Sequence, residues 1–88
     1  MTEMDWQNEA VWKAIDAIAA VRGISTSRLA IISGHNSTAF NKSKRVNKHS
    51  GEMRWPTMEA IAKVLRAANM TYAEFGALVD DKMGRRRA

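Results

Sequence analysis

Apolar residues recur at helical spacing over most of this chain. Spacings of four, three and one predict a first helix over about residues 5–22. Its apolar stripe consists of Val11, Trp12, Ile15, Ile18 and Ala19. Gly23 is a typical helix stop, and Ile24 is expected to reach under the core. The first quarter of the chain is therefore predicted to be one amphipathic helix.

Two shorter helices are predicted next. One begins at Ser25 or Thr26, either of which can cap it, and ends at Gly34. Its inward residues are Leu29, Ala30 and Ile32. The next runs from after Asn36 to about residue 45, with Phe40 as its one large apolar residue. Because a single anchor buries little area, this helix is expected to lie on the surface of the domain.

Residues 46–56 break the periodicity. Eleven residues form a long connection between helices, and connections of that length tend to be functional or mobile. We expect Trp55 to act as a core or hinge anchor that ties this loop to the following helix. His49 is interpreted as an ordinary loop residue.

The last part of the chain carries the clearest helix signals. Thr57 can cap a fourth helix that ends near Asn69, and Thr71 with Glu74 forms a capping box for a fifth. The apolar faces of these two helices are Met58, Ile61, Val64, Leu65 and Ala68, then Phe75, Leu78 and Val79. We predict one domain over residues 1–80 and a flexible basic tail or linker over residues 81–88.

The positive charge of the chain is concentrated in its middle third. Residues 22–54 hold seven Lys and Arg against one Glu, a net charge of +6, whereas the remaining residues hold seven cations and eight anions. Positive charge gathered in this way attracts polyanions such as nucleic acids. The alternative is a basic surface that is only solvated.

Residues 26–45 have the layout of a helix-turn-helix. The two short helices are joined by the turn 33–36, in which Gly34 accommodates the bend. The second helix of such a motif fits the major groove of duplex DNA, which is about 12 Å wide. An enzyme is not indicated, since no serine or lysine lies beside a positioned base in a known pattern.

The residue types in this motif assign two kinds of DNA contact. The predicted base-reading residues are Ser37, Thr38, Asn41 and Lys42, because amide, ammonium and short hydroxyl side chains suit base edges. The predicted phosphate-contacting residues are Thr26, Ser27, Arg28, Lys44, Arg45, Lys48 and Arg54. Thr26 and Ser27 are included because free N–H groups at a helix start favour anions.

Several stretches resemble a known family. S-R-L-A-x-x-S-G, the polar segment TAFNKSKR and the segment RWPTMEAIAKVLRAANMTYAEF look like lambda-repressor-like helix-turn-helix domains. They look closest to phage-repressor-like regulators of bacteria, which carry such a domain ahead of a LexA-like peptidase domain. The resemblance covers roughly residues 10–80. His35 and Ser43 depart from it, since apolar residues are common at their positions.

The resemblance implies an all-α, five-helix domain that binds DNA as a transcriptional regulator, in the first instance a repressor. It further implies a homodimer on a palindromic operator. Because the sequence has neither a membrane span nor a secretory signal, we expect the protein in the cytoplasm, at the nucleoid. The fifth helix, with Tyr72, is the expected dimer surface. Two other functions stay open from the sequence: an antitoxin-like or adaptor module that binds protein, and a non-specific nucleic-acid binder, RNA included.

Other classes are not indicated. The chain has no cysteine for a disulfide or thiolate site, and two isolated histidines do not form a metal site. We therefore expect no cofactor and no metal. No apolar run reaches the length of a membrane span, and the acidic start lacks the pattern of a secretory signal.

Overall fold

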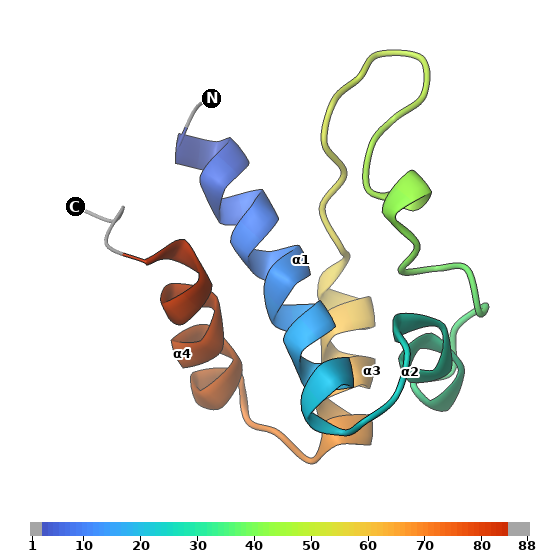
Figure 1. Cartoon of the computed structure of the whole chain (residues 1–88), viewed down its shortest axis with the longest axis vertical. Helices are drawn as coiled ribbons and strands as arrows, with labels where there is room; N and C mark the ends of the chain where they lie inside the picture. Colours follow the sequence, from blue (N-terminus) through green and yellow to red (C-terminus); the bar gives the residue numbers. More distant parts are fainter. Residues whose placement is uncertain (1–2, 85–88) are drawn as a thin grey trace.

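The computed structural model describes residues 3–84, with side chains from residue 6 onward, and this part of the chain is all-helical (Figure 1). Its elements are α1 (Glu3–Val21), α2 (Thr26–Ile32), the 3₁₀ helix η1 (Lys42–Lys44), α3 (Met58–Ala68) and α4 (Tyr72–Met83). The predicted all-α class is confirmed. None of the described helices is both long and apolar enough to cross a bilayer.

The core lies where α1 meets the other helices. α4 packs along α1, while α2 contacts both α1 and α3 (Figure 1). The buried apolar residues include Trp12, Ile15, Ile18, Leu29, Phe40, Val64, Leu65 and Phe75. They follow the predicted stripes of the helices, and Ile24 packs against them as expected. Burial of these side chains is the main force that holds the short helices together.

The helix ends match the predicted signals. Ser25 Oγ accepts from Arg28 N at 3.0 Å, and Thr57 Oγ1 accepts from Ala60 N at 3.0 Å. The capping box of α4 is complete: Glu74 N donates to Thr71 Oγ1, and Thr71 N donates to Glu74 Oε1. Asn69 ends α3 in the left-handed conformation, with φ of 54°. Side-chain caps satisfy N–H groups that the helix itself leaves free.

Some burial predictions are wrong. Ile32, Trp55 and Met58 are exposed. α2 has only seven residues, so Leu29 and Ala30 already fill its inward face. Trp55 is not a core anchor. The chain beside it is held through the backbone carbonyl of Arg54 instead.

The predicted α-helix over residues 36–45 is not formed, so the described chain has four α-helices rather than five. Residues 37–40 form turns, Asn41 is extended with ψ of 147°, and only η1 is helical. An α-helix would give the Phe40 carbonyl to the N–H of Lys44. Here Lys44 N donates to Asn41 O, and the Phe40 carbonyl accepts from the Arg45 guanidinium. The helix-turn-helix expected at residues 26–45 therefore lacks its second helix.

The end of the predicted domain also differs. α4 continues to Met83 and Gly84 follows it, so the last helix extends past residue 80 into the segment predicted as a tail. Residues 85–88, which include the three arginines of that tail, lie outside the described residues.

Candidate nucleic-acid interface

The polar segment after α2 is a compact turn with one apolar anchor. Asn36 Oδ1 accepts from both the backbone N–H and the hydroxyl of Thr38, each at 3.1 Å. Phe40 is 3% exposed and packs edge-on against Trp12 and His35. Gly34, with φ of 87°, makes the bend that precedes this turn. The anchor points inward, so the polar side chains around it are left at the surface.

Residues 45–54 form a hairpin, which we call the basic hairpin. Val46 and Met53 make an antiparallel bridge, Asn47 N donates to Glu52 O, and Arg54 N donates to Arg45 O. The Asn47 side chain accepts from the backbone of residues 49 and 50 and closes the tip. The hairpin rises away from the helices (Figure 1). The long loop expected from the sequence is therefore an ordered element.

One face of α1 holds both ends of the basic hairpin. Arg45 Nη2 and Nη1 donate to the two carboxylate oxygens of Asp16 at 2.6 and 3.0 Å, and its guanidinium lies 4.8 Å from the Trp12 ring centroid. At the other end, the Arg54 carbonyl accepts from Asn8 Nδ2 and Trp12 Nε1, each at 2.9 Å. Residues 8, 12 and 16 are four apart, so they share one side of the helix.

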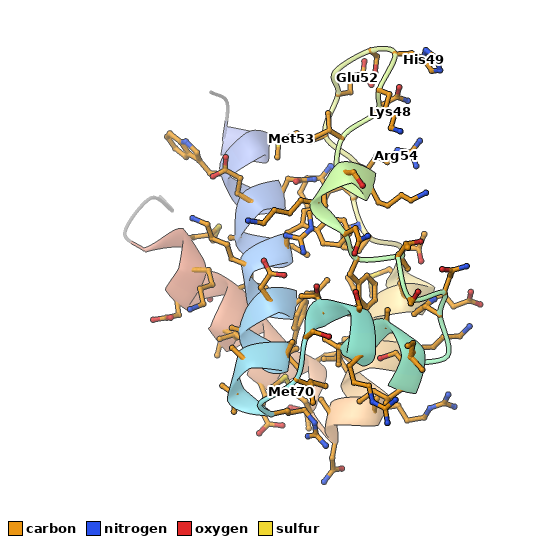
Figure 2. All side chains as sticks on the ribbon, turned by 45° about the vertical axis from the view of Figure 1, so that its right-hand side comes forward. Lys48, His49, Glu52, Met53, Arg54 and Met70 are labelled. Carbon is orange, nitrogen blue, oxygen red and sulfur yellow. The ribbon has the colours of Figure 1, made fainter. Side chains whose placement is uncertain are left out.

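A polar groove opens along the basic hairpin. Its lining residues are Ser43, Lys44, Val46, Asn47, Lys48, His49 and Arg54, around a volume of about 280 Å³. Figure 2 shows Lys48 and His49 at the tip and Arg54 on the returning arm. Three cations around one groove, none in an ion pair with a described acidic residue, favour an anionic partner.

The predicted base-reading residues precede the hairpin in the chain and do not line the polar groove, and Lys42 lines a depression beside Trp12 and Asp16 instead. Ser37, Thr38 and Lys42 are exposed, and Asn41 is half-buried. They sit on the turn and on η1 rather than along one helix face. The relative positions of these side chains are therefore set by the turn and by η1, and not by the regular spacing of an α-helix.

The predicted phosphate-contacting residues divide into two groups. Those with exposed side chains are Arg28, Lys44, Lys48 and Arg54. Thr26, Ser27 and Arg45 are half-buried. Thr26 and Ser27 lie in the first turn of α2, whose cap is Ser25. The Arg45 side chain is 12% exposed and engaged with Asp16 and the Phe40 carbonyl, so its role in the fold is to hold the basic hairpin.

The sequence reasoning missed the side of α1 that anchors the basic hairpin. Asn8 and Asp16 are polar, and they flank the apolar stripe one turn before and after Trp12. That spacing was the only available signal. The spacing does not identify the hydrogen-bond partners of Asn8 and Asp16, which are 29 to 46 residues away in the chain.

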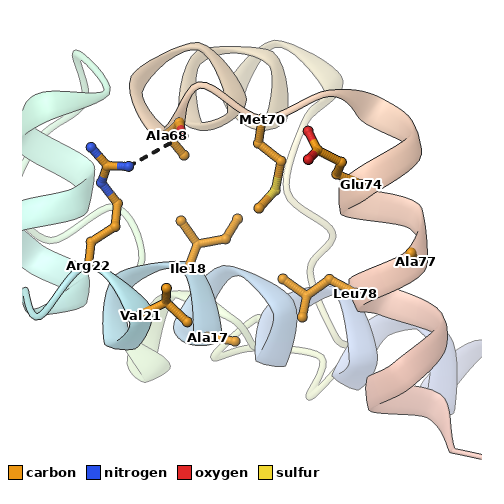
Figure 3. Close-up of a pocket in the computed structure, with 9 residues that line it drawn as sticks. All are labelled: Ala17, Ile18, Val21, Arg22, Ala68, Met70, Glu74, Ala77 and Leu78. Atoms are coloured by element: carbon orange, nitrogen blue, oxygen red, sulfur yellow. Dashed lines mark hydrogen bonds between the residues drawn. The ribbon is translucent and has the colours of Figure 1, made fainter.

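A second, apolar groove lies on the other side of α1 (Figure 3). It is formed by α1, the end of α3 and α4, with a volume of about 430 Å³. Its apolar lining includes Ile18, Met70 and Leu78. Arg22 and Glu74 lie at its opposite ends (Figure 3). Arg22 Nη1 donates to the Ala68 carbonyl at 3.3 Å. Val21, beside this groove, is 88% exposed.

Comparison with known proteins adds no further assignment. No protein-family model, curated protein or solved structure gives a significant match to this chain. Among the described residues, no three acidic, histidine or cysteine side chains gather as metal ligands. The function is therefore argued from the residues of the chain itself.

Proposed function

We propose that this chain binds double-stranded DNA through the surface of residues 36–54 and acts as a transcriptional regulator, in the first instance a repressor. One observation carries the proposal: Lys44, Lys48 and Arg54 surround a single groove, exposed and without acidic partners among the described residues. These three cations of the positively charged middle third therefore stay available for a polyanion.

The two parts of this surface have different tasks in the proposal. The exposed cations of the basic hairpin contact phosphates, which gives affinity and sets the register. The turn carries the exposed Ser37 and Thr38, and η1 carries the exposed Lys42. Together with the half-exposed Asn41, these side chains reach base edges. Because no α-helix spans residues 36–45, base contact is made from a turn and a short 3₁₀ helix.

Selection of bound sequences from a random duplex pool, at two salt concentrations, tests the proposal. An enriched motif is expected, and two-fold symmetry in it indicates a dimer on a palindromic operator. Asn41→Ala should relax preference at one base position by about 1–3 kcal/mol. Lys44→Ala should weaken all sequences alike and lower the salt slope by about one phosphate contact. Binding that neither substitution changes would remove this surface from the interface.

The adaptor function makes the opposite prediction. A module that binds only protein should give no salt-dependent shift with any duplex. A non-specific binder should give strong salt dependence and no enriched motif, and an RNA binder should prefer single strands. The same selection, repeated with single-stranded RNA, therefore separates the three functions.

Dimerisation belongs to the same proposal. The apolar groove beside α4 and the exposed Tyr72 and Val21 support a second copy of the chain as partner. Val21→Asp places a charge on an exposed position, so the fold should be unaffected. Sedimentation should then show a shift from dimer to monomer, and affinity for a full palindrome should fall more than affinity for a half-site. A wild-type chain that sediments as a monomer would contradict this part.

A further inference from the structure

We infer that Asp16 and Trp12 are positioning residues for DNA binding: they touch no DNA themselves, but fix the direction in which the basic hairpin presents its cations. The inference rests on the proposed function and deepens it. It assigns a role to a face of α1 that lies outside the basic segment of the sequence.

The first support is the need for an anchor. A lone two-stranded hairpin is only marginally stable in water, and this one has a single bridge, between Val46 and Met53. Its cations would otherwise sample many directions, and the entropy of ordering them would be lost on binding. Contacts that hold the hairpin before DNA arrives reduce that loss.

The second support is the position of the contacts. Asp16 accepts a bidentate hydrogen bond from Arg45 at the start of the hairpin. The same guanidinium lies over the Trp12 ring in a cation–π contact. The indole N–H of Trp12 also donates to the Arg54 carbonyl at the end of the hairpin. Both arms are therefore held by adjacent turns of one rigid helix, and planar fork contacts fix orientation as well as distance.

The third support is the sign of the charge. Asp16 is an acid beside a surface proposed to bind a polyanion, and its side chain is 35% exposed. Long-range electrostatics alone predicts that its removal strengthens DNA binding. Positioning predicts that its removal weakens DNA binding. The two effects have opposite signs, which makes the role of Asp16 measurable.

The test compares Asp16→Ala with Glu9→Ala in the full chain. Glu9 lies on the same helix and lines the same depression as Trp12, Asp16 and Met53, but forms no ion pair with a described residue. Both variants lose one negative charge and gain the same side chain. We expect Glu9→Ala to bind duplex DNA as tightly as wild type or about twofold more tightly. We expect Asp16→Ala to bind about fivefold more weakly.

The salt dependence of binding separates positioning from simple loss of stability. A less stable protein binds less, but its folded fraction keeps the same slope of affinity against salt. Asp16→Ala should instead lower that slope by about one to two units, as contacts from Lys48 and Arg54 are lost. Binding by Asp16→Ala that is equal to or tighter than that of wild type, with an unchanged slope, would overturn the inference.

Amide chemical shifts test the anchor without DNA. Resonances of residues 46–53 should shift or broaden in Asp16→Ala and stay in place in Glu9→Ala. This readout stays informative if the wild-type chain does not bind DNA, in which case the proposed function fails on its own. If Asp16→Ala does not fold, Asp16→Asn decides, since it keeps the size and shape of the side chain and removes its charge and one acceptor oxygen. A two- to threefold weaker affinity then supports the inference, and an unchanged affinity refutes it.

Discussion

α3 and residues 36–45 are of similar length, yet only α3 is an α-helix. α3 has Thr57 as a cap and buries Ile61, Val64 and Leu65 on one side. Residues 36–45 bury Phe40 alone, and the Asn36 side-chain oxygen accepts from both the backbone N–H and the hydroxyl of Thr38. Short helices need packing of an apolar face to persist in water. Where that face is a single ring, local turns and the half-buried Arg45 set the backbone conformation.

The two regions also differ in what they contribute to the domain. The helices α1, α3 and α4 supply a packed frame, whereas residues 36–54 carry exposed cations and polar groups on turns (Figure 2). The second region is held by few contacts: Phe40 in the core, Arg45 on Asp16 and the Arg54 carbonyl on α1. Substitutions in each region can therefore test how the two regions differ.

The largest effect is expected for Phe40→Ala. It removes the one ring that seats the turn, so the free energy of unfolding should fall by about 3 kcal/mol in a urea titration. Phe75→Ala on α4 is the matched control, with the same chemistry and similar burial. Both should lose stability, but only Phe40→Ala should also move the amide resonances of the basic hairpin. A loss below about 1 kcal/mol for Phe40→Ala would show that the turn does not depend on its ring.

A smaller loss is expected for Arg45→Met. The aliphatic part is kept, but the bonds to Asp16 and to the Phe40 carbonyl disappear, which should cost about 2 kcal/mol. Lys44→Met is the control, since that neighbour is exposed and should change stability by less than about 0.5 kcal/mol. Equal effects of the two substitutions in the same urea titration would contradict the assignment of Arg45 to the fold.

The hydroxyl groups of Thr57 and Thr38 should contribute different amounts to the stability of the fold. Thr57→Ala removes the hydroxyl that caps α3 and should cost about 1 kcal/mol. Thr38→Ala removes a hydroxyl that bonds Asn36 in an exposed turn and should cost about 0.5 kcal/mol or less. Thermal melts of both variants give the comparison. A larger loss for Thr38 would mean that the turn contributes more to stability than its exposure indicates.

The smallest effect is expected for Asn41→Ala in the free protein. Alanine favours helix over asparagine by about half a kcal/mol, so stability should change by no more than that. Residues 37–45 should nevertheless stay non-helical, because the Phe40 carbonyl is still held by Arg45. Cα chemical shifts report this directly. Helical shifts across residues 37–45 in the variant would show that local propensity, rather than Arg45, sets the turn.

Local patterns in the sequence predicted the all-α class, the extents of α1 and α3, the start of α4, the caps at Thr57 and Thr71, and the burial of Phe40. These features depend on the order of neighbouring residues, because helix caps and apolar stripes are local. The predicted site residues Ser37, Thr38, Lys42, Lys44, Lys48 and Arg54 are exposed, whereas Thr26, Ser27, Asn41 and Arg45 are half-buried.

The conformation of residues 36–54 depends on contacts between distant parts of the chain. The segment has the spacing of a short helix and a loop, but Arg45 reaches Asp16 across 29 residues, and Trp12 and Asn8 reach Arg54 across 42 and 46. Arg45, which Asp16 holds in place, bonds the Phe40 carbonyl that a helix would need, and the contacts to the Arg54 carbonyl hold the other end of the hairpin. Pairings between distant residues follow from how the helices pack, and no local pattern specifies them.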